Sequence, residues 1–334
     1  MTAGARAARL VDVARLAGVS PMTVSNVIND RVGFTEETRR RVLDAIAETG
    51  YQPNRAAQHL RTRRARRVGF HLIGEQLDIR NPFALSLLRP LVRAADARNY
   101  RVTVTAHPVA SPDEFRNDAT ARDVDGFILS DCDLGDYRVE ILSELQVPFV
   151  VMGRTLPDQP QTWVDIDNRV AIEEMVDLLV DRGHKSFSYL GYADDHYWAV
   201  ERRDGVQARL AHHGLRLPES RILKATQDQL APLLHEIIGS EARPSVLVTG
   251  SDSIAVVAVT IAQSYGLVVG RDIAVTGFDG CSLESIVDPP LTTVQIPVPE
   301  IAEALIDRFV REMDGPTHDA GTLVPTRILQ GASA

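Results

Sequence analysis

The chain has 334 residues, of which 44% are hydrophobic and 24% are charged, a composition typical of soluble globular proteins. Its length predicts two or three domains. No uncharged apolar run reaches the ~18 residues that a membrane span needs, and no apolar segment follows the N-terminal arginines as in a secretory signal. We therefore expect a cytoplasmic protein. Cys132 and Cys281 are far apart in sequence and have no His or Cys neighbours, so neither a disulfide framework nor a metal or other cofactor is expected.

The charge is distributed unevenly along the chain. Residues 1–67 contain 13 arginines and 6 acidic residues, a balance of +7, whereas residues 68–334 contain 23 basic and 39 acidic residues, a balance of −16. A basic N-terminal fifth on an acidic protein is typical of a nucleic-acid-binding head attached to a larger body. An unevenly charged surface without a binding role is the alternative interpretation.

The residues from Leu10 to Asn29 predict two short helices. Apolar side chains recur at helical spacing up to Ala17, and Gly18 then interrupts the pattern. Ser20 is a suitable N-cap for the second helix, and Pro21 at its first position sacrifices no hydrogen bond. We expect Val24, Val27 and Ile28 to face inward.

A third helix is predicted after Thr35, with Thr38 near its start, and it ends at Gly50. Its apolar series is expected to be Val42, Leu43, Ile46 and Ala47. Three short helices with a glycine turn between the first two are typical of a helix-turn-helix unit.

In such a unit the second helix enters the major groove of DNA and its early side chains meet base edges. Asn26 can pair with adenine through two hydrogen bonds, whereas Pro21 and Met22 offer apolar contact, for example to a thymine methyl group. The predicted phosphate-binding residues of this unit are polar: Thr23, Ser25, Asn29, Thr35 and Thr38. Ser20 is a further predicted DNA-binding residue. A small three-helix bundle that touches no DNA remains the alternative.

The segment 51–61 follows, and then a basic run that ends at Arg67. Pro53 can open a short helix, which is marginal in water and needs a partner to pack against. Leu60 can act as an apolar wedge that unstacks a base step and kinks the duplex. The predicted DNA-binding residues of this segment are Tyr51, Asn54, Arg55, Ala57, Gln58 and Leu60. A flexible basic linker is the alternative.

With these features, the chain resembles the lactose-repressor family of bacterial transcription regulators. The resemblance covers nearly the whole chain and is carried by DVARLAGVSPMTVSNVIN, TEETRRRVLDAIAETGYQPN, RAAQHLR, NPF, DGFILS, DIDNRVA, RGH, GRDIAVTGFD and PPLTTVQIP. It implies a homodimer that binds a near-palindromic double-stranded operator. It also implies that paired hinge helices lie in the minor groove, with Leu60 as the intercalating residue.

From residue 68 onward, apolar runs of the β type alternate with helical segments, which predicts α/β lobes with parallel sheets and helices on both faces. The runs are 68–73, 101–106, 126–130, 147–152, 187–192, 245–250 and 273–278. The family resemblance implies a body like the periplasmic sugar-binding proteins, in which the chain crosses between two lobes near 166 and 296. The predicted organisation is a helix-turn-helix domain (8–50), a hinge with a basic linker (51–67), an N-terminal lobe (68–166 with 296–322) and a C-terminal lobe (167–295 with 323–331).

A small effector, a sugar or a nucleoside, is expected in the cleft between the lobes, outside the carboxyl ends of the strands. The resemblance implies effector binding by Arg202 and Asp279. Arg154 and Asp252 follow apolar strands and are further candidates, although Asp252 could instead be the N-cap of the helix it precedes. Phe83 could stack on a ring of the effector or pack in the core.

The chain departs from the family pattern at Ser251, Gly153 and Asn26, positions at which many members have Asn, an acidic residue, and Arg or His, respectively. These departures leave the effector and the operator sequence open. No nucleophile elbow, phosphate loop or metal-ligand pair is visible, so we expect no enzyme. The prediction is a ligand-responsive repressor. A solute receptor without a regulatory role and an α/β enzyme with an accessory DNA-binding domain are the rival interpretations.

Overall fold

The structure is a computed structural model that describes residues 8–28, 33–51, 64–73, 83–107, 111–156, 161–192, 196–280, 287–315 and 321–334. The chain divides into two compact units, Met1–Arg64 and Ala65–Ala334. Each unit has its own hydrophobic core and is described by itself. In the described parts of the chain, no helix is both long and apolar enough to cross a membrane.

The first unit, which we call the head, contains three helices: α1 (Leu10–Ala17), α2 (Pro21–Ile28) and α3 (Glu36–Thr49). The helix α1 ends because Gly18 adopts a left-handed conformation with φ of +63°, which costs glycine little. The helix α3 begins directly after its N-cap Thr35, whose hydroxyl accepts a hydrogen bond from the amide of Thr38 at 3.2 Å. Both helix boundaries are therefore encoded by local sequence.

The core of the head consists of small apolar side chains from all three helices: Val13, Ala14, Ala17, Val24, Val27, Val42 and Ala45. Ile28 packs against this core but remains partly exposed. The prediction for α3 was wrong in part, because Leu43 is 49% exposed and Ala47 is exposed, while Ala45 is buried. The buried apolar face of α3 is narrow, because α3 packs against only two short helices and they cover only part of its surface.

The second unit, which we call the body, contains two six-stranded sheets. The first sheet has the order β11-β5-β4-β3-β1-β2 and its strand pairs are parallel. Its strands are β1 (Arg67–Ile73), β2 (Arg101–His107), β3 (Phe127–Leu129), β4 (Phe149–Met152), β5 (Trp163–Asp165) and β11 (Gly321–Leu323). Its helices are α5 (Phe83–Ala97), α6 (Pro112–Thr120), α7 (Tyr137–Glu144) and α12 (Val298–Glu312).

The second sheet has the order β12-β10-β9-β8-β6-β7, parallel except for β12, which runs antiparallel to β10. Its strands are β6 (Phe187–Gly191), β7 (Ile222–Lys224), β8 (Val246–Thr249), β9 (Ala274–Asp279), β10 (Thr292–Gln295) and β12 (Arg327–Leu329). Its helices are α8 (Asn168–Asp181), α9 (Tyr197–His212), α10 (Leu230–Gly239) and α11 (Asp252–Ser264).

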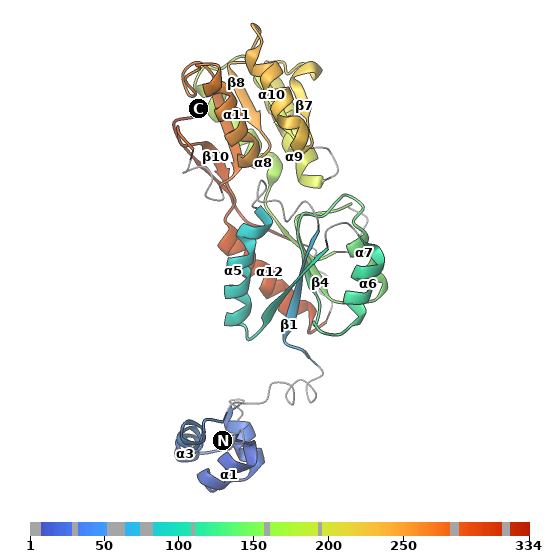
Figure 1. The fold of residues 1–334 in the computed structure, drawn as a ribbon, viewed down its shortest axis with the longest axis vertical. Coiled ribbons are helices and arrows are strands. Elements are labelled where there is room, and N and C mark those ends of the chain that lie inside the picture. The colour runs from blue at the N-terminus through green and yellow to red at the C-terminus, as the bar shows by residue number, and fades with distance from the viewer. Residues whose placement is uncertain are drawn as a thin grey trace, which may run out of the picture. The chain divides into compact units, whose positions relative to one another are not determined.

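Helices cover both faces of each sheet (Figure 1). In β3, Phe127 and Leu129 pack toward α6 and α7, whereas Ile128 packs toward α5 and α12. This alternation follows from the two-residue period of a strand. The predicted class, a helical head with an α/β body of two parallel-sheet lobes, is confirmed.

Each of the seven apolar runs in the sequence overlaps a strand of the structure. The chain passes from the first sheet to the second after β5, returns after β10 and crosses again between β11 and β12. The two lobes are therefore built from segments that are far apart in sequence, while the exact domain limits stay a prediction.

Candidate functional site

The helix α2 is held in the head by two residues and presents others to solvent. Val24 and Val27 are buried, whereas Met22 is 64% exposed. Pro21 is exposed and Asn26 is partly exposed. A large apolar side chain on the surface of a small domain is available to contact a partner. The buried Val24 and Val27 hold the other side of α2 against the core of the head.

Two hydroxyl pairs cap the helices of the head. Ser20 Oγ accepts a hydrogen bond from the amide of Thr23 at 3.1 Å and lies 2.9 Å from the Thr23 hydroxyl. The hydroxyls of Thr35 and Thr38 are 3.0 Å apart. These side chains thus have a structural role in addition to any predicted phosphate contact. Ser25 and Tyr51 are partly exposed. The remaining predicted DNA-binding residues lie outside the described residues: Asn29, Asn54, Arg55, Ala57, Gln58 and Leu60.

A pocket of about 560 Å³, part of it open to solvent, lies between the two sheets of the body. The lining comes from both lobes: Phe83, Asp131, Met152, Gly153, Asp165, Ile166, Asn168, Tyr192, Trp198, Arg202, Ser251, Asp279 and Ile296. Several of these residues end a strand or directly follow one, as expected for parallel sheets. Of the five predicted effector residues, Phe83, Arg202 and Asp279 line this pocket.

Arg202 is the central cation of the pocket, and its side chain is 6% exposed. It donates hydrogen bonds to Asn168 Oδ1 and to the carbonyl oxygen of Gly250, each at 2.8 Å. Its guanidinium lies 4.7 Å from the ring centre of Trp198 and 3.5 Å from that of Phe278. These contacts hold a planar group with several donors in one orientation, which suits recognition of hydroxyl or carboxylate oxygens.

Asp279 ends β9 beside Arg202, with 3.6 Å between its Oδ1 and Nη1 of Arg202. Its backbone has φ of +128°, a strained value for a residue other than glycine. Burial raises the pKa of Asp279 to about 8, and the charge of Arg202 opposes this rise only in part. The carboxyl group is therefore poised to change its protonation near neutral pH.

Asp252 contacts the residue that follows Asp279 and is not among the lining residues of the pocket. Its Oδ1 accepts a hydrogen bond from the Thr293 hydroxyl at 2.5 Å and its Oδ2 accepts one from the amide of Gly280 at 2.8 Å. The alternative that Asp252 caps its helix is wrong, because the side chain of Ser251 accepts the hydrogen bond from the amide of Ile254. Asp252 instead fixes the turn that follows Asp279.

Arg154 is also not among the lining residues. Its Nε donates to Asp165 at 2.8 Å and its Nη2 donates to Glu201 at 2.7 Å. The guanidinium also faces the rings of Trp163 and Tyr197 at 5.3 and 4.6 Å. Because Asp165 belongs to the first sheet and Glu201 to α9, Arg154 joins the two lobes beside the pocket.

Ten lining residues were not predicted from the sequence. Asp131 and Tyr192 lie at the ends of predicted strands, so the rule that pockets form at strand ends could have identified them. Asn168 and Trp198 lie on helices of the second lobe. No local pattern marks those two residues, because their role depends on the packing of α8 against α9.

Two family models match the chain in different parts. Residues 9–54 match the model described as bacterial regulatory proteins, lacI family. Residues 176–334 match the model described as periplasmic binding protein-like domain. The first covers the three helices of the head, and the second includes all six strands of the second sheet.

Similar proteins match along almost the entire chain. The HTH-type transcriptional regulator MalR of Streptomyces coelicolor is 31% identical, and the match covers 98% of this chain and 96% of MalR. A solved structure of a transcriptional regulator CelR–cellobiose complex is 25% identical, covers 98% of this chain and 100% of its own, and has a TM-score of 0.75. The lac repressor dimer bound to operator and the anti-inducer ONPF shares the fold, with 22% identity, coverage of 98% and 99%, and a TM-score of 0.81.

Proposed function

The chain belongs to the lacI family of bacterial regulatory proteins, and on this basis we propose that it is a repressor whose DNA binding responds to a sugar or a nucleoside held in the pocket of the body. It is a DNA-binding transcription regulator, like the relatives that it matches over nearly their whole length. The cytoplasm, where the chromosome lies, is the compartment that this function requires.

The observation that carries the ligand proposal is the arrangement around Arg202. One buried guanidinium, the carboxyl group of Asp279 and the amide of Asn168 meet beside the half-buried rings of Trp198 and Tyr192. Carboxylates and amides suit the hydroxyl groups of a sugar, and aromatic rings suit its apolar faces or a nucleobase. The cellobiose bound by the similar CelR structure supports a sugar over a nucleoside.

We propose that the ligand acts by changing how the two lobes close. Because the pocket is lined from both sheets, a bound ligand makes its full set of contacts in only one arrangement of the lobes. Such a ligand shifts the equilibrium by the difference in its affinity for the two arrangements, typically about 1–3 kcal/mol. Whether that shift releases or favours the operator depends on which arrangement the ligand prefers.

The DNA-binding surface of this proposal is the exposed part of α2 with the segment that follows the head. Pro21, Met22 and Asn26 would meet bases, and Leu60 would be the minor-groove wedge. The phosphate contacts would come from the hydroxyl and amide side chains of Thr23, Ser25, Asn29, Thr35 and Thr38. The other proposed DNA-contacting residues are Ser20, Tyr51, Asn54, Arg55, Ala57 and Gln58.

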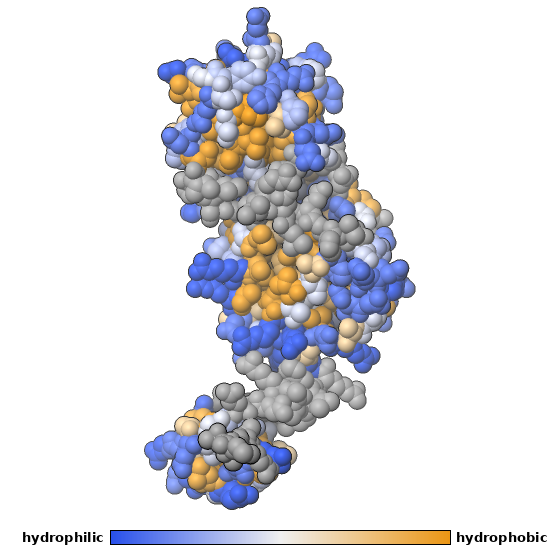
Figure 2. Space-filling model, in the orientation of Figure 1, coloured by the Kyte–Doolittle hydropathy of each residue, from blue (hydrophilic) through white to orange (hydrophobic). Residues whose placement is uncertain are grey.

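We further propose that the protein acts as a homodimer. Leu85 and Val92 lie seven residues apart on α5, and are 39% and 45% exposed. Figure 2 shows apolar side chains at the surface of the lobe that carries α5. Val104 on the edge strand β2, which packs against α5, is 43% exposed as well. A second copy of the chain would cover these side chains, and Val92→Asp is expected to yield monomers in sedimentation analysis.

The experiment that tests the function is selection of operators from random duplexes with the purified full chain, at physiological salt. The expected result is enrichment of a two-fold symmetric site, and failure to enrich one would refute the repressor. Repeating the selection with a panel of sugars and nucleosides identifies the effector as the compound that changes occupancy. Recovery of that compound unchanged after prolonged incubation distinguishes a regulator from an enzyme with an accessory DNA-binding domain.

A further inference from the structure

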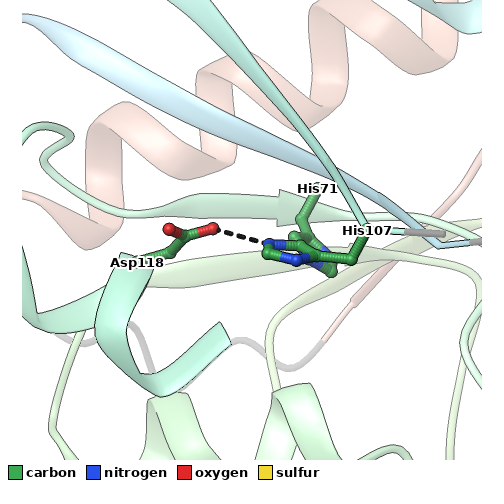
Figure 3. A group of neighbouring side chains, drawn as sticks. All are labelled: His71, His107 and Asp118. Carbon is green, nitrogen blue, oxygen red and sulfur yellow. Dashed lines mark hydrogen bonds and ion pairs between the residues drawn. The ribbon is translucent and has the colours of Figure 1, made fainter. Parts of the chain in front are cut away.

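Two histidines and an aspartate from three elements meet on one face of the first sheet. His71 lies on β1, His107 ends β2 and Asp118 lies on α6. One potential ligand atom from each lies within 4.8 Å of the other two. Figure 3 shows the two imidazole rings beside one another, with the carboxylate of Asp118 directed at His107. In the part of the chain that the structure describes, this is the one group of its kind.

The strand register explains how the two histidines meet. His71 is paired with Thr105, and His107 lies two residues further along β2. Residues two apart in a strand share a face of the sheet, so both imidazoles project toward α6. Phe115 of α6 packs edge-on against the ring of His71, with 4.6 Å between the ring centres. The imidazole is therefore held in place on this face.

His71 is fully buried, and neither of its ring nitrogens has a hydrogen-bond partner. Buried polar groups almost always have one, so an imidazole with two unsatisfied nitrogens requires an explanation. Burial lowers the pKa of His71 to about 4, and the charge of Arg138 adds to this effect. His71 is thus neutral near pH 7, the form in which an imidazole nitrogen can bind a metal ion.

His107 lies between two carboxylates. Its Nε2 is 3.0 Å from Asp118 Oδ2, and its Nδ1 is 2.7 Å from Glu114 Oε2. The hydrogen bond to Asp118 is the main cause of a raised pKa for His107, and Glu114 contributes to the rise. The cluster therefore combines one neutral buried histidine with one histidine whose two nitrogens are both oriented by acids.

We propose that His71, His107 and Asp118 form a binding site for a divalent first-row transition metal ion such as Zn²⁺. Two imidazoles and one carboxylate suit this class of ion, whereas Mg²⁺ and Ca²⁺ prefer oxygen ligands alone. The ion would take a nitrogen of His71, Nε2 of His107 and Oδ2 of Asp118, and water would complete its coordination. It would replace the proton between His107 and Asp118 and would satisfy one nitrogen of His71.

Glu114 would support the site without binding the ion. A metal-bound histidine usually donates its other N–H to a carboxylate, which fixes the orientation of the ring. The contact between His107 Nδ1 and Glu114 Oε2 already has this geometry. Asp113, the residue before Glu114, is exposed and takes no part in the cluster.

The site is accessible and needs only local adjustment. The side chains of His107 and Asp118 are 18% and 33% exposed, so the ion can enter from the surface with His71 at the base of the site. The ligand atoms of a bound tetrahedral Zn²⁺ are about 3.3 Å apart, given its bond lengths of roughly 2.0–2.1 Å. Rotation of the partly exposed Asp118 and His107 side chains can bring the ligand atoms, now within 4.8 Å of one another, to this separation. The nearby cation Arg138 is neutralised by Asp136 at 2.7 Å.

Zn²⁺ titration of the full chain by calorimetry, after treatment with a chelator, tests the proposal. The expected result is one ion per chain, with a visible absorption band when Co²⁺ replaces Zn²⁺. Asp118→Asn and His107→Gln remove ligands and are expected to weaken binding at least tenfold. Glu114→Gln is expected to weaken it about 10- to 100-fold through the orientation of His107. These measurements require neither DNA nor an effector, so they stand independently of the proposed function.

His71→Leu provides a version of the test that separates binding from folding. Leucine leaves no unsatisfied nitrogen at this buried position, so the metal-free variant is expected to be at least as stable as the wild type. Zn²⁺ is expected to raise the Tm of the wild type and not that of the variant. Asp113→Asn and the exposed His212→Gln are the matched controls, with unchanged affinity expected. Equal Zn²⁺ affinity in the wild type, His71→Leu and Asp118→Asn would overturn the proposal, as would absence of binding by the wild type.

Discussion

The guanidinium of Arg154 lies 2.7 Å from the carboxylate of Glu201, and this ion pair links the lobe of the first sheet to helix α9 of the second. Both side chains are largely buried, with 21% and 15% exposure. Arg154 also holds Asp165, whose side chain is 3% exposed and lines the pocket. The contact between the lobes is therefore coupled to the position of a group that a ligand would meet.

Glu201→Gln and Arg154→Met are expected to differ in their effect on stability. Glu201→Gln weakens one charge-assisted hydrogen bond and leaves Arg154 paired with Asp165, a loss of about 1–2 kcal/mol in the free energy of unfolding. Arg154→Met leaves Asp165 buried without its cation, which typically costs about 3–5 kcal/mol. Chemical denaturation of both variants provides the comparison. Equal losses would show that Asp165 does not depend on Arg154.

Asp279 is expected to make stability depend on pH. Its pKa is raised by burial to about 8, above that of the unfolded chain, so its stabilising effect is greatest at low pH and is lost as pH rises toward the folded value. Between pH 6 and 8 the free energy of unfolding of the wild type is expected to fall, relative to Asp279→Asn, by up to about 1.4 kcal/mol per pH unit. Denaturant titrations at several pH values measure this difference. Parallel pH profiles for the two proteins would contradict it.

Arg202→Met is expected to affect both stability and ligand binding. The substitution removes the donors to Asn168 and to the Gly250 carbonyl, and it leaves Asp279 without its cation. The acceptors on Asn168 and Gly250 stay buried without a donor, so we expect a loss of about 1–3 kcal/mol for each in the free energy of unfolding. At temperatures where the variant stays folded, operator binding is expected to persist and the ligand response to be lost.

The fluorescence of Trp198 provides a direct readout of the pocket. The chain contains two tryptophans, Trp163 and Trp198, so Trp163→Phe leaves Trp198 as the only one. A ligand that reaches the pocket is expected to change its emission in this background and not after Arg202→Met. The same change of emission in both proteins, or no change in either, would place the ligand elsewhere.

Asn26→Ala is expected to alter the choice of DNA sequence without altering the head. Loss of a two-hydrogen-bond contact to a base costs about 1–3 kcal/mol of discrimination at one base pair. Non-specific affinity and its dependence on salt are expected to stay the same, because they depend on phosphate contacts. Binding assays on operator variants at two salt concentrations test this. Val24→Ala is the contrasting control, since it removes a buried side chain from the core of the head and should weaken all binding by destabilising the fold.

Local sequence was sufficient to predict the head and the long strands. The helix α1 ends at Gly18 because of the backbone freedom of glycine, and α3 starts after Thr35 because the threonine hydroxyl caps it. Both effects act over three or four positions. The buried strands appear as apolar runs. The strands that the apolar runs missed have only three or four residues: β5, β7, β10, β11 and β12. Such strands are too short for a periodic pattern, and they form by pairing with neighbouring strands.

The binding groups depended on tertiary structure. Arg202 meets Asn168 and Asp279 because α8, α9 and β9 converge at one end of the second sheet. In the sequence, His71 is one polar residue within an apolar run, with nothing to relate it to His107 36 positions later. The parallel register of β1 and β2 brings the two rings together, and α6 adds Asp118. Short-range backbone preferences thus determine the elements, whereas a site made of distant side chains exists only once the sheets have paired and the helices have packed on them.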